Sequence, residues 1–388
     1  MAQSLSRRGR SILAIAMIGS LLALNSTATD SGAIPARVAH PLKVGLSYGD
    51  TLVWMSDARL SAALDDTVAL GAGWVRADLS WQDIQYDGRT AHNWWLFDRV
   101  VDAANKRHLT VLPVLAYTPP WARPANCGSP SCGPADPQAF ATFAQEATAR
   151  YAPKGVHVWE IWNEPNLTGF WLPAPAPAAY NALLQAAAKA IRRTDPTAKL
   201  VLGGLASTRT ADGNISQSDF LAGVSALGGN RVVDAVGYHP YTYPYLPSAR
   251  TTFRTPWERM ERGSDSLRRV LTSHGTPGLP VWVTEVGAPT GGPGTSSDGR
   301  LSSIKPSTTH VTETLQARIA VDSVRTASTA PHVAALVWYA DRDLSTDRSS
   351  NENFYGLRRA DGSVKPAFGA LRGAITALGR QNDRKASR

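Results

Sequence analysis

The stretch VHVWEIWNEP, residues 156–165, combines an apolar run with an abrupt polar end. Its β-branched and aromatic residues are typical of a strand buried on both faces, and Pro165 cannot continue a strand ladder. Side chains alternate along a strand, so Glu160 and Glu164 are expected on the same face. We interpret Glu164 as a functional carboxylate at the strand end. Glu160 is interpreted as a buried structural charge with Arg76 as partner, and a direct catalytic role for Glu160 is the alternative.

Runs of the same kind recur along the chain, at residues 43–48, 74–81, 109–117, 199–207, 232–241, 280–287 and 333–340. The segments between them have helical periodicity, and Asp136-Pro137 is one clear helix start signal. Buried strands that alternate with helices predict an α/β fold, a closed (β/α)8 TIM barrel in one domain over residues 43–379. The rival is a doubly wound sheet, but GLSYGDTLVW after the first strand lacks the glycine-rich phosphate turn of that fold.

The two ends of the chain are expected to lie outside this barrel. Three arginines precede an apolar run that is too short to span a membrane, which predicts a signal peptide over residues 1–28, cleaved near Ala28. An uncleaved amphipathic anchor is the alternative, and the export route stays open. Residues 29–42 are expected to form an extension, and residues 380–388 a basic disordered tail.

Charge and cysteine content narrow the class of partner. The formal charge of +9 falls to +6 without the three arginines of the signal and to +4 without the basic tail. This balance argues against nucleic acid binding, because no basic stripe interleaved with aromatic residues is present. Cys127 and Cys132 frame the short loop CGSPSC, and in an exported chain they predict a local disulfide.

In parallel barrels the functional residues gather at the carboxyl ends of the strands. The candidates at these positions are Arg76, Tyr117, Trp121, Asn163, Glu164, His239, Tyr241, Glu285 and Trp338. The strand ends place Glu164 and Glu285 at the same mouth of the barrel. Trp338 is expected to stack on a sugar, whereas stacking and packing both stay open for Trp121 and for Trp81.

Two carboxylates among aromatic residues suit glycosidic bond cleavage, in which one protonates the leaving oxygen while the other attacks the anomeric carbon. Glu285 must stay ionised, and Arg76 with Tyr241 or His239 is expected to hold it so. Asn163 is expected to bind the sugar 2-hydroxyl.

Other chemistries are poorly supported by the sequence. The other histidines are scattered and no strand end carries a two-histidine ligand pair, so no catalytic metal is expected. No lysine ends a strand and no G-x-S-x-G elbow is present, which disfavours Schiff-base and serine mechanisms. We expect no organic cofactor.

The motifs WNEP and VTEVG, which close the fourth and seventh strands, resemble those of clan A glycoside hydrolases, as do VRADLSW, YHPY and VWYA. The resemblance implies a retaining (β/α)8 enzyme with Glu164 as general acid/base and Glu285 as nucleophile. Within the clan, YTPPWA, WEIWNEPN and NFYGLRRADGSVKPAF are most similar to family 39, especially its bacterial exopolysaccharide hydrolases, with family 5 cellulases second. Tyr117 stands where many family 5 enzymes have histidine.

The sequence therefore predicts an exported retaining β-glycoside hydrolase, secreted or in the cell envelope, that acts on a polysaccharide or oligosaccharide. A monomer without stable membrane insertion is expected. The long loop at residues 287–309 is expected to cover the bound sugar. The alternative function is a non-catalytic carbohydrate-binding barrel of the envelope.

Overall fold

The computed structural model describes residues 41–386, with side chains described through residue 384. The predicted signal peptide and most of the extension at residues 29–42 lie outside the described residues.

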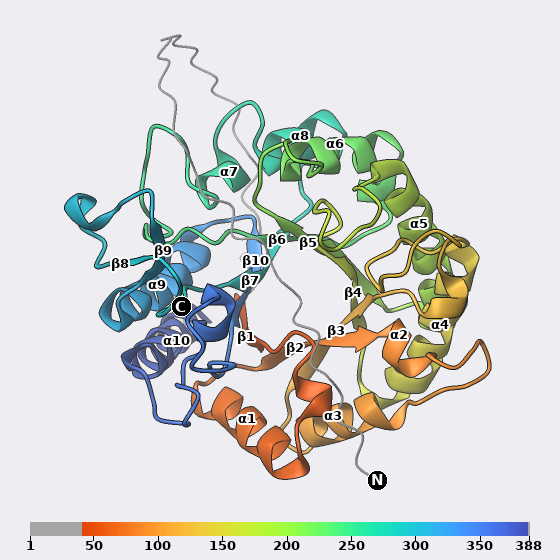
Figure 1. The fold of residues 1–388 in the computed structure, drawn as a ribbon, viewed down its shortest axis with the longest axis horizontal. Coiled ribbons are helices and arrows are strands. Elements are labelled where there is room, and N and C mark those ends of the chain that lie inside the picture. Colours follow the sequence, from red (N-terminus) through yellow and green to blue (C-terminus); the bar gives the residue numbers. More distant parts are fainter. Residues whose placement is uncertain (1–40, 387–388) are drawn as a thin grey trace.

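Eight parallel strands close into a barrel in the order β1-β10-β7-β6-β5-β4-β3-β2. Figure 1 looks along this barrel and shows the strands as a central ring with the helices outside it. The barrel strands are β1 (Lys43–Ser47), β2 (Trp74–Ser80), β3 (Thr110–Ala116), β4 (Val158–Asn163), β5 (Lys199–Ala206), β6 (Ala235–His239), β7 (Val281–Val286) and β10 (Val333–Tyr339). Each of the eight strands predicted from the sequence is present, and the (β/α)8 fold is confirmed.

Helices follow the strands and cover the barrel. The α-helices are α1 (Asp57–Ala69), α2 (Trp81–Ile84), α3 (Trp95–Asn105), α4 (Pro137–Tyr151), α5 (Pro177–Thr194), α6 (Gln217–Ala226), α7 (Glu258–Glu261), α8 (Leu267–Ser273), α9 (Glu313–Thr329) and α10 (Pro366–Ala386). Short 3-10 helices are η1 (Leu52–Trp54), η2 (Pro120–Ala122), η3 (Ala152–Lys154), η4 (Gly229–Arg231), η5 (Leu301–Ser303) and η6 (Asn351–Phe354). As expected, Asp136 caps α4 by accepting a hydrogen bond from the Gln138 amide at 2.9 Å.

The core has two parts, because a barrel strand buries one face inward and the other against helices. The inner cluster consists of Leu112, Val201, Ala235, Trp282 and Ala335, one residue from each of five strands. The outer cluster is larger and joins strand residues to the helix layer.

Two segments differ from expectation. The loop at residues 287–309 is not structureless, since β8 (Thr295–Ser297) pairs with β9 (Thr308–Val311) in a small parallel sheet. The predicted disordered tail is helical through Ala386, because α10 continues into it. Arginine, lysine, glutamine and alanine, which fill much of this end, all favour helix.

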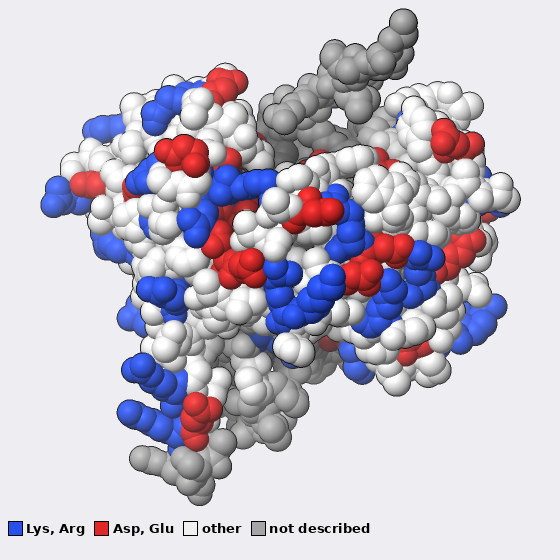
Figure 2. Space-filling view, turned by 90° about the horizontal axis from the view of Figure 1, so that it is seen from below, with Lys and Arg blue, Asp and Glu red and all other residues white. Residues whose placement is uncertain are grey.

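The predicted disulfide between Cys127 and Cys132 is formed. It stiffens the loop after β3, which is also tied to the loop after β4 by the hydrogen bond from the Leu172 amide to the Ser131 carbonyl at 2.9 Å. None of the helices within the described part of the chain is long and apolar enough to cross a membrane. On the face seen in Figure 2, basic and acidic side chains are interspersed.

Candidate active site

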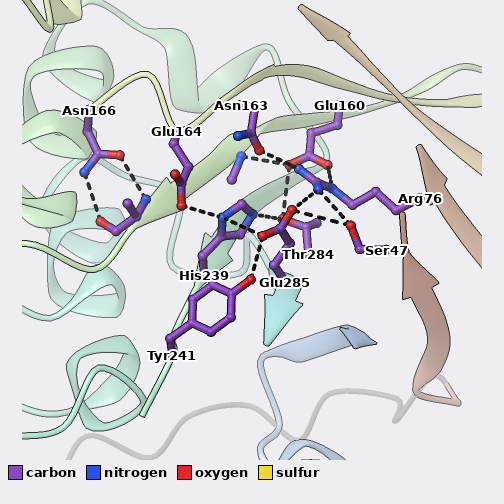
Figure 3. A network of polar contacts seen from close by, with 12 residues as sticks. Ser47, Arg76, Glu160, Asn163, Glu164, Asn166, His239, Tyr241, Thr284 and Glu285 are labelled. Atoms are coloured by element: carbon purple, nitrogen blue, oxygen red, sulfur yellow. Dashed lines mark hydrogen bonds and ion pairs between the residues drawn. The ribbon is translucent and has the colours of Figure 1, made fainter. Parts of the chain in front are cut away.

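Arg76 on β2 is the hub of the polar network at the carboxyl ends of the strands. Its Nε donates to Glu160 Oε2 at 2.6 Å, its Nη1 to Glu285 Oε1 at 2.5 Å and its Nη2 to Asn163 Oδ1 at 2.8 Å. Figure 3 shows the guanidinium between these three side chains. The predicted pairing of Arg76 with Glu160 is confirmed, and the same cation also holds Glu285.

Glu160 is a fully buried and fully partnered carboxylate. Besides Arg76, its Oε1 accepts hydrogen bonds from the Gly204 amide at 2.8 Å and from Thr284 Oγ1 at 3.1 Å. Its exposed fraction is 0%, so it lies too deep to meet a substrate. Burial acts to lower the pKa of Arg76, but the charges of Glu160 and Glu285 raise that pKa overall, so the guanidinium stays charged.

The end of β4 departs from simple alternation. Trp162 and Glu164 have φ angles of 73° and 44°, in the left-handed region that side chains other than glycine rarely adopt. Trp162 therefore packs on Trp171, with ring centroids 5.0 Å apart, while Asn163 faces the same interior as Glu160. Strain of this kind is common at functional sites, and here it delivers two adjacent polar side chains to one mouth.

His239 at the end of β6 joins the two predicted catalytic carboxylates. Its Nδ1 lies 2.9 Å from Glu164 Oε1 and 3.7 Å from Glu285 Oε2. The imidazole fits because position 204 is glycine: a Cβ there would lie 2.0 Å from His239 Nε2. Glu164 and Glu285 thus lie at one mouth of the barrel, as the strand ends predicted, with His239 between them.

The hydrogen-bond network assigns the tautomer of His239. Thr284 Oγ1 donates its single proton to Glu160, so it must accept from His239 Nε2, which lies 3.1 Å away. Nδ1 of His239 and Glu164 Oε1 then share one proton, which the nitrogen carries when the imidazole is charged and the carboxyl group carries when it is neutral. The contact between Glu164 and His239 can therefore hold a proton at the mouth of the site, as a general acid requires.

Glu285 on β7 has the opposite surroundings. Tyr241 donates its hydroxyl to Glu285 Oε2 at 2.7 Å, and Ser47 donates to Oε1 at 3.4 Å. Burial acts to raise the pKa of Glu285, but His239 when charged, Arg76 and Tyr241 together lower it below the usual value. Glu285 is therefore held ionised, by the residues the sequence named.

The structure does not bring Trp338 into the site. Its exposed fraction is 1%, and it belongs to the outer core cluster. Tyr339 points inward instead, because it pairs in register with Ser47, whose hydroxyl accepts from Arg76. Burial first, and then the charges of Glu352 and Glu285, raise the pKa of Tyr339.

The aromatic residues expected after β3 have packing partners. Tyr117 is 3% exposed, with its ring 6.2 Å from that of Trp162. Trp121 is half-buried; its Nε1 donates to the Gln85 carbonyl at 2.7 Å, and Arg89 lies 5.0 Å from its ring centre. Trp81 is fully buried against Phe143.

Sequence reasoning missed a third carboxylate, Glu352 in η6. Burial, followed by the charges of Glu164 and Glu285, raises the pKa of Glu352 to about 8. The only sequence signal for Glu352 as a site residue is its position shortly after the last barrel strand. No cluster of histidine, cysteine and acidic residues suited to a metal ion is found in residues 41–386.

Comparison with known proteins agrees with this geometry. The family model described as Cellulase (glycosyl hydrolase family 5) matches residues 39–316, more than half of the chain. A β-xylosidase from Geobacillus stearothermophilus is 32% identical over 145 residues, which are 35% of this chain and 27% of the relative. The match thus spans only about a quarter of that relative's length.

Solved structures share the fold. A family 39 glycoside hydrolase from Bacteroides cellulosilyticus WH2 has a TM-score of 0.64 at 22% identity, covering 87% of this chain and 64% of that chain. A GH5_18 protein from Streptomyces cattleya, solved with GlcNAc, has a TM-score of 0.63 at 18% identity, covering 88% of this chain and 81% of that chain. Both clan A families named from the sequence are therefore represented.

Proposed function

We propose that this chain, which belongs to the cellulase family (glycosyl hydrolase family 5 of clan A), hydrolyses β-glycosidic bonds in a polysaccharide or oligosaccharide. The reaction proceeds with retention of configuration. Glu285 is the nucleophile and Glu164 the general acid/base. The observation that carries this assignment is the contrast at His239: Glu164 is hydrogen-bonded to its Nδ1, while Glu285 is held ionised by Arg76 and Tyr241.

The reaction needs both protonation states at once. Ionised Glu285 attacks the anomeric carbon, and Glu164 gives its proton to the leaving oxygen as the glycosidic bond breaks. Glu164 then takes a proton from water, whose oxygen displaces Glu285 and restores the starting state. Asn163 accepts from Arg76 through Oδ1, so its amide nitrogen is left to donate to the sugar 2-hydroxyl.

We further propose that the protein is exported and acts outside the cytoplasm. The support is the arginine-flanked apolar run at the N-terminus and the disulfide, which fits an oxidising compartment. A polymer of the cell envelope or of an extracellular matrix is a substrate that such a location makes accessible.

The decisive experiment separates the two carboxylates. Glu285→Gln should abolish hydrolysis of every substrate that the wild type cleaves. Glu164→Ala should keep more activity on activated aryl glycosides than on natural linkages, and azide should restore its activity. Glu146→Gln, at a half-exposed site on α4, is the matched control and should keep full activity.

Product stereochemistry, followed by NMR, should show the β-anomer first. Substantial activity in Glu285→Gln would refute its role as nucleophile. A properly folded wild-type chain that binds glycans but never cleaves them would favour the non-catalytic barrel.

A further inference from the structure

Asn166 lies in the turn after β4, shortly beyond Glu164, and its side chain is fully buried. Its Oδ1 accepts a hydrogen bond from the Ala206 amide at 2.9 Å. Its Nδ2 donates to the carbonyls of Ala206 and Ile215, both at 2.9 Å. In Figure 3 it stands beside Glu164, at the end of the network opposite Arg76. The side-chain amide thus joins the turn to the end of β5 and to the segment before α6.

The backbone of the turn is joined to the same two segments. The Glu164 amide donates to the Gly204 carbonyl at 3.0 Å, and the Ile215 amide donates to the Asn166 carbonyl at 2.9 Å. The Leu167 amide donates to the Glu164 carbonyl at 3.0 Å, which closes the turn. Side chain and backbone together therefore fix the position of this turn against β5.

Glu164 needs such support because its backbone conformation is strained. Its φ of 44° lies in the left-handed region, where a residue other than glycine stays only if the surrounding structure holds it. The side chain of Asn166 supplies three of the hydrogen bonds around this conformation. Removal of that side chain should let the backbone relax and turn the carboxyl group of Glu164 away from its present position.

The hydrogen-bond partner of Glu164 is fixed to the same strand end. Ala206 lies opposite His239 in the pairing of β5 with β6. Asn166 binds the same Ala206 through both atoms of its amide group. His239 Nδ1 in turn lies 2.9 Å from Glu164 Oε1. These contacts form a closed circuit, so Asn166 sets the position of the carboxyl group relative to the imidazole.

We propose that Asn166 is a positioning residue for the general acid/base, and that it holds Glu164 where its proton reaches the leaving oxygen. This inference rests on the proposed function and adds a residue to it. The three side-chain hydrogen bonds of Asn166 all go to backbone atoms rather than to Arg76 or Glu285. Loss of Asn166 should therefore weaken proton transfer and leave the attack by Glu285 intact.

The dependence of the rate on the leaving group tests this role, because a good leaving group needs little help from an acid. The probes are the dinitrophenyl, nitrophenyl and phenyl β-cellobiosides and the matching β-xylobiosides. In Asn166→Ala, kcat/KM for the phenyl glycosides should fall at least about tenfold more than kcat/KM for the dinitrophenyl glycosides. A role in stability alone would lower all of these rates by one common factor.

Asn166→Asp gives the same kinetic test without a cavity, and it serves if the alanine variant does not fold. It keeps the acceptor for the Ala206 amide but loses the Nδ2 donor to two carbonyls. It should show the same steeper dependence on the leaving group.

The contact between Glu164 and His239 gives a second readout, which needs no turnover. The nitrogen chemical shift of His239 Nδ1, measured by NMR, reports the hydrogen bond to Glu164. This shift should change in Asn166→Ala in the same direction as in Glu164→Ala.

Asn214→Ala is the matched control. Asn214 is also buried, and its Oδ1 accepts from the Thr168 amide at 2.9 Å, so it binds the same loop after β4 without bonding to Ala206. Its loss should lower stability but keep the wild-type dependence on the leaving group and the wild-type Nδ1 shift.

An unchanged leaving-group dependence or an unchanged Nδ1 shift in Asn166→Ala would overturn the inference, and so would equal changes in Asn214→Ala. Failure of the proposed function is seen separately, as no cleavage of any glycoside by the wild type. In that case the Nδ1 shift still decides whether Asn166 positions Glu164.

Discussion

Glu285 and Glu352 are both largely buried carboxylates at one mouth of the barrel, yet their proton affinities move in opposite directions. His239 when charged, then Arg76 and the hydrogen bond from Tyr241, lower the pKa of Glu285 despite its burial. Burial and the charges of Glu164 and Glu285 raise the pKa of Glu352 to about 8, and no cation is among the groups that shift this pKa.

The difference shows that the neighbouring charges and hydrogen-bond donors, rather than burial, decide the charge of a carboxylate here. The donors to Glu285 come from β1, β2 and the loop after β6, and all point at one pair of oxygens. Removing these donors one at a time should raise the pKa of Glu285, as the pKa of Glu352 is raised.

The largest effect is expected for Arg76→Met, which leaves both Glu160 and Glu285 without their cation. Breaking a buried ion pair costs about 3–5 kcal/mol of folding stability. The pKa of Glu285 should also rise, so the acidic limb of kcat/KM should move to higher pH. Urea unfolding and pH-rate profiles measure the two effects.

Arg300→Met is the control for Arg76→Met, because Arg300 is 83% exposed beside Asp298. Its loss should cost less than about 0.5 kcal/mol. If the two variants were equally stable, the buried network would not have the role assigned to it.

A smaller effect is expected for Tyr241→Phe, which removes the 2.7 Å hydrogen bond to Glu285. Since that bond stabilises the charged form, kcat/KM should fall about tenfold or more, and its acidic limb should rise by about 0.5–1 pH unit. Tyr243→Phe, which leaves all donors to Glu285 in place, should not move this limb. An unchanged limb in Tyr241→Phe would contradict the proposed contrast.

Glu352→Gln should change how folding stability depends on pH. In the unfolded chain the carboxyl ionises near 4.5, but in the folded chain it keeps its proton to about 8. The folded state therefore binds more protons between these values, so the wild type loses stability as pH rises through this window.

The variant lacks that loss, and its stability relative to the wild type should improve by about 4 kcal/mol from pH 5 to pH 9. Glu285 acts with the opposite sign, since its stabilisation is present above its unfolded pKa and is lost at lower pH. Parallel stability curves for variant and wild type would show that Glu352 is not perturbed.

The smallest effect is expected for Ser47→Ala. The hydroxyl lies 3.4 Å from Glu285 Oε1 and 3.2 Å from Arg76 Nη1, so both hydrogen bonds are long. Activity should change less than about threefold and the acidic limb by less than about 0.3 pH unit. A change as large as that of Tyr241→Phe would mean that donors to Glu285 act as one unit.

Much of the fold was predictable because the periodicity of apolar residues and the residues that end each strand are local properties of the chain. Each barrel strand shows as a short buried run, and parallel strands bring their carboxyl ends together. The strand ends predicted that Glu164, Glu285 and His239 lie at one mouth of the barrel, and the need of the buried Glu160 for a partner predicted its pairing with Arg76.

The rule that side chains alternate between the two faces of a strand failed where the backbone leaves the extended region. The positive φ at Trp162 reverses alternation, so Asn163 rather than Trp162 faces the interior. At β10 the choice between Trp338 and Tyr339 depended on pairing with Ser47 across the barrel closure, which no local pattern contains.

The sequence by itself determined the barrel, the two carboxylates at its mouth and the arginine that pairs with them, because periodicity and residue type are written along the chain. Only the tertiary structure decided the protonation of those groups and the place of Glu352. Proton affinity depends on burial and on charges from elements far apart in the chain, and these meet only after folding.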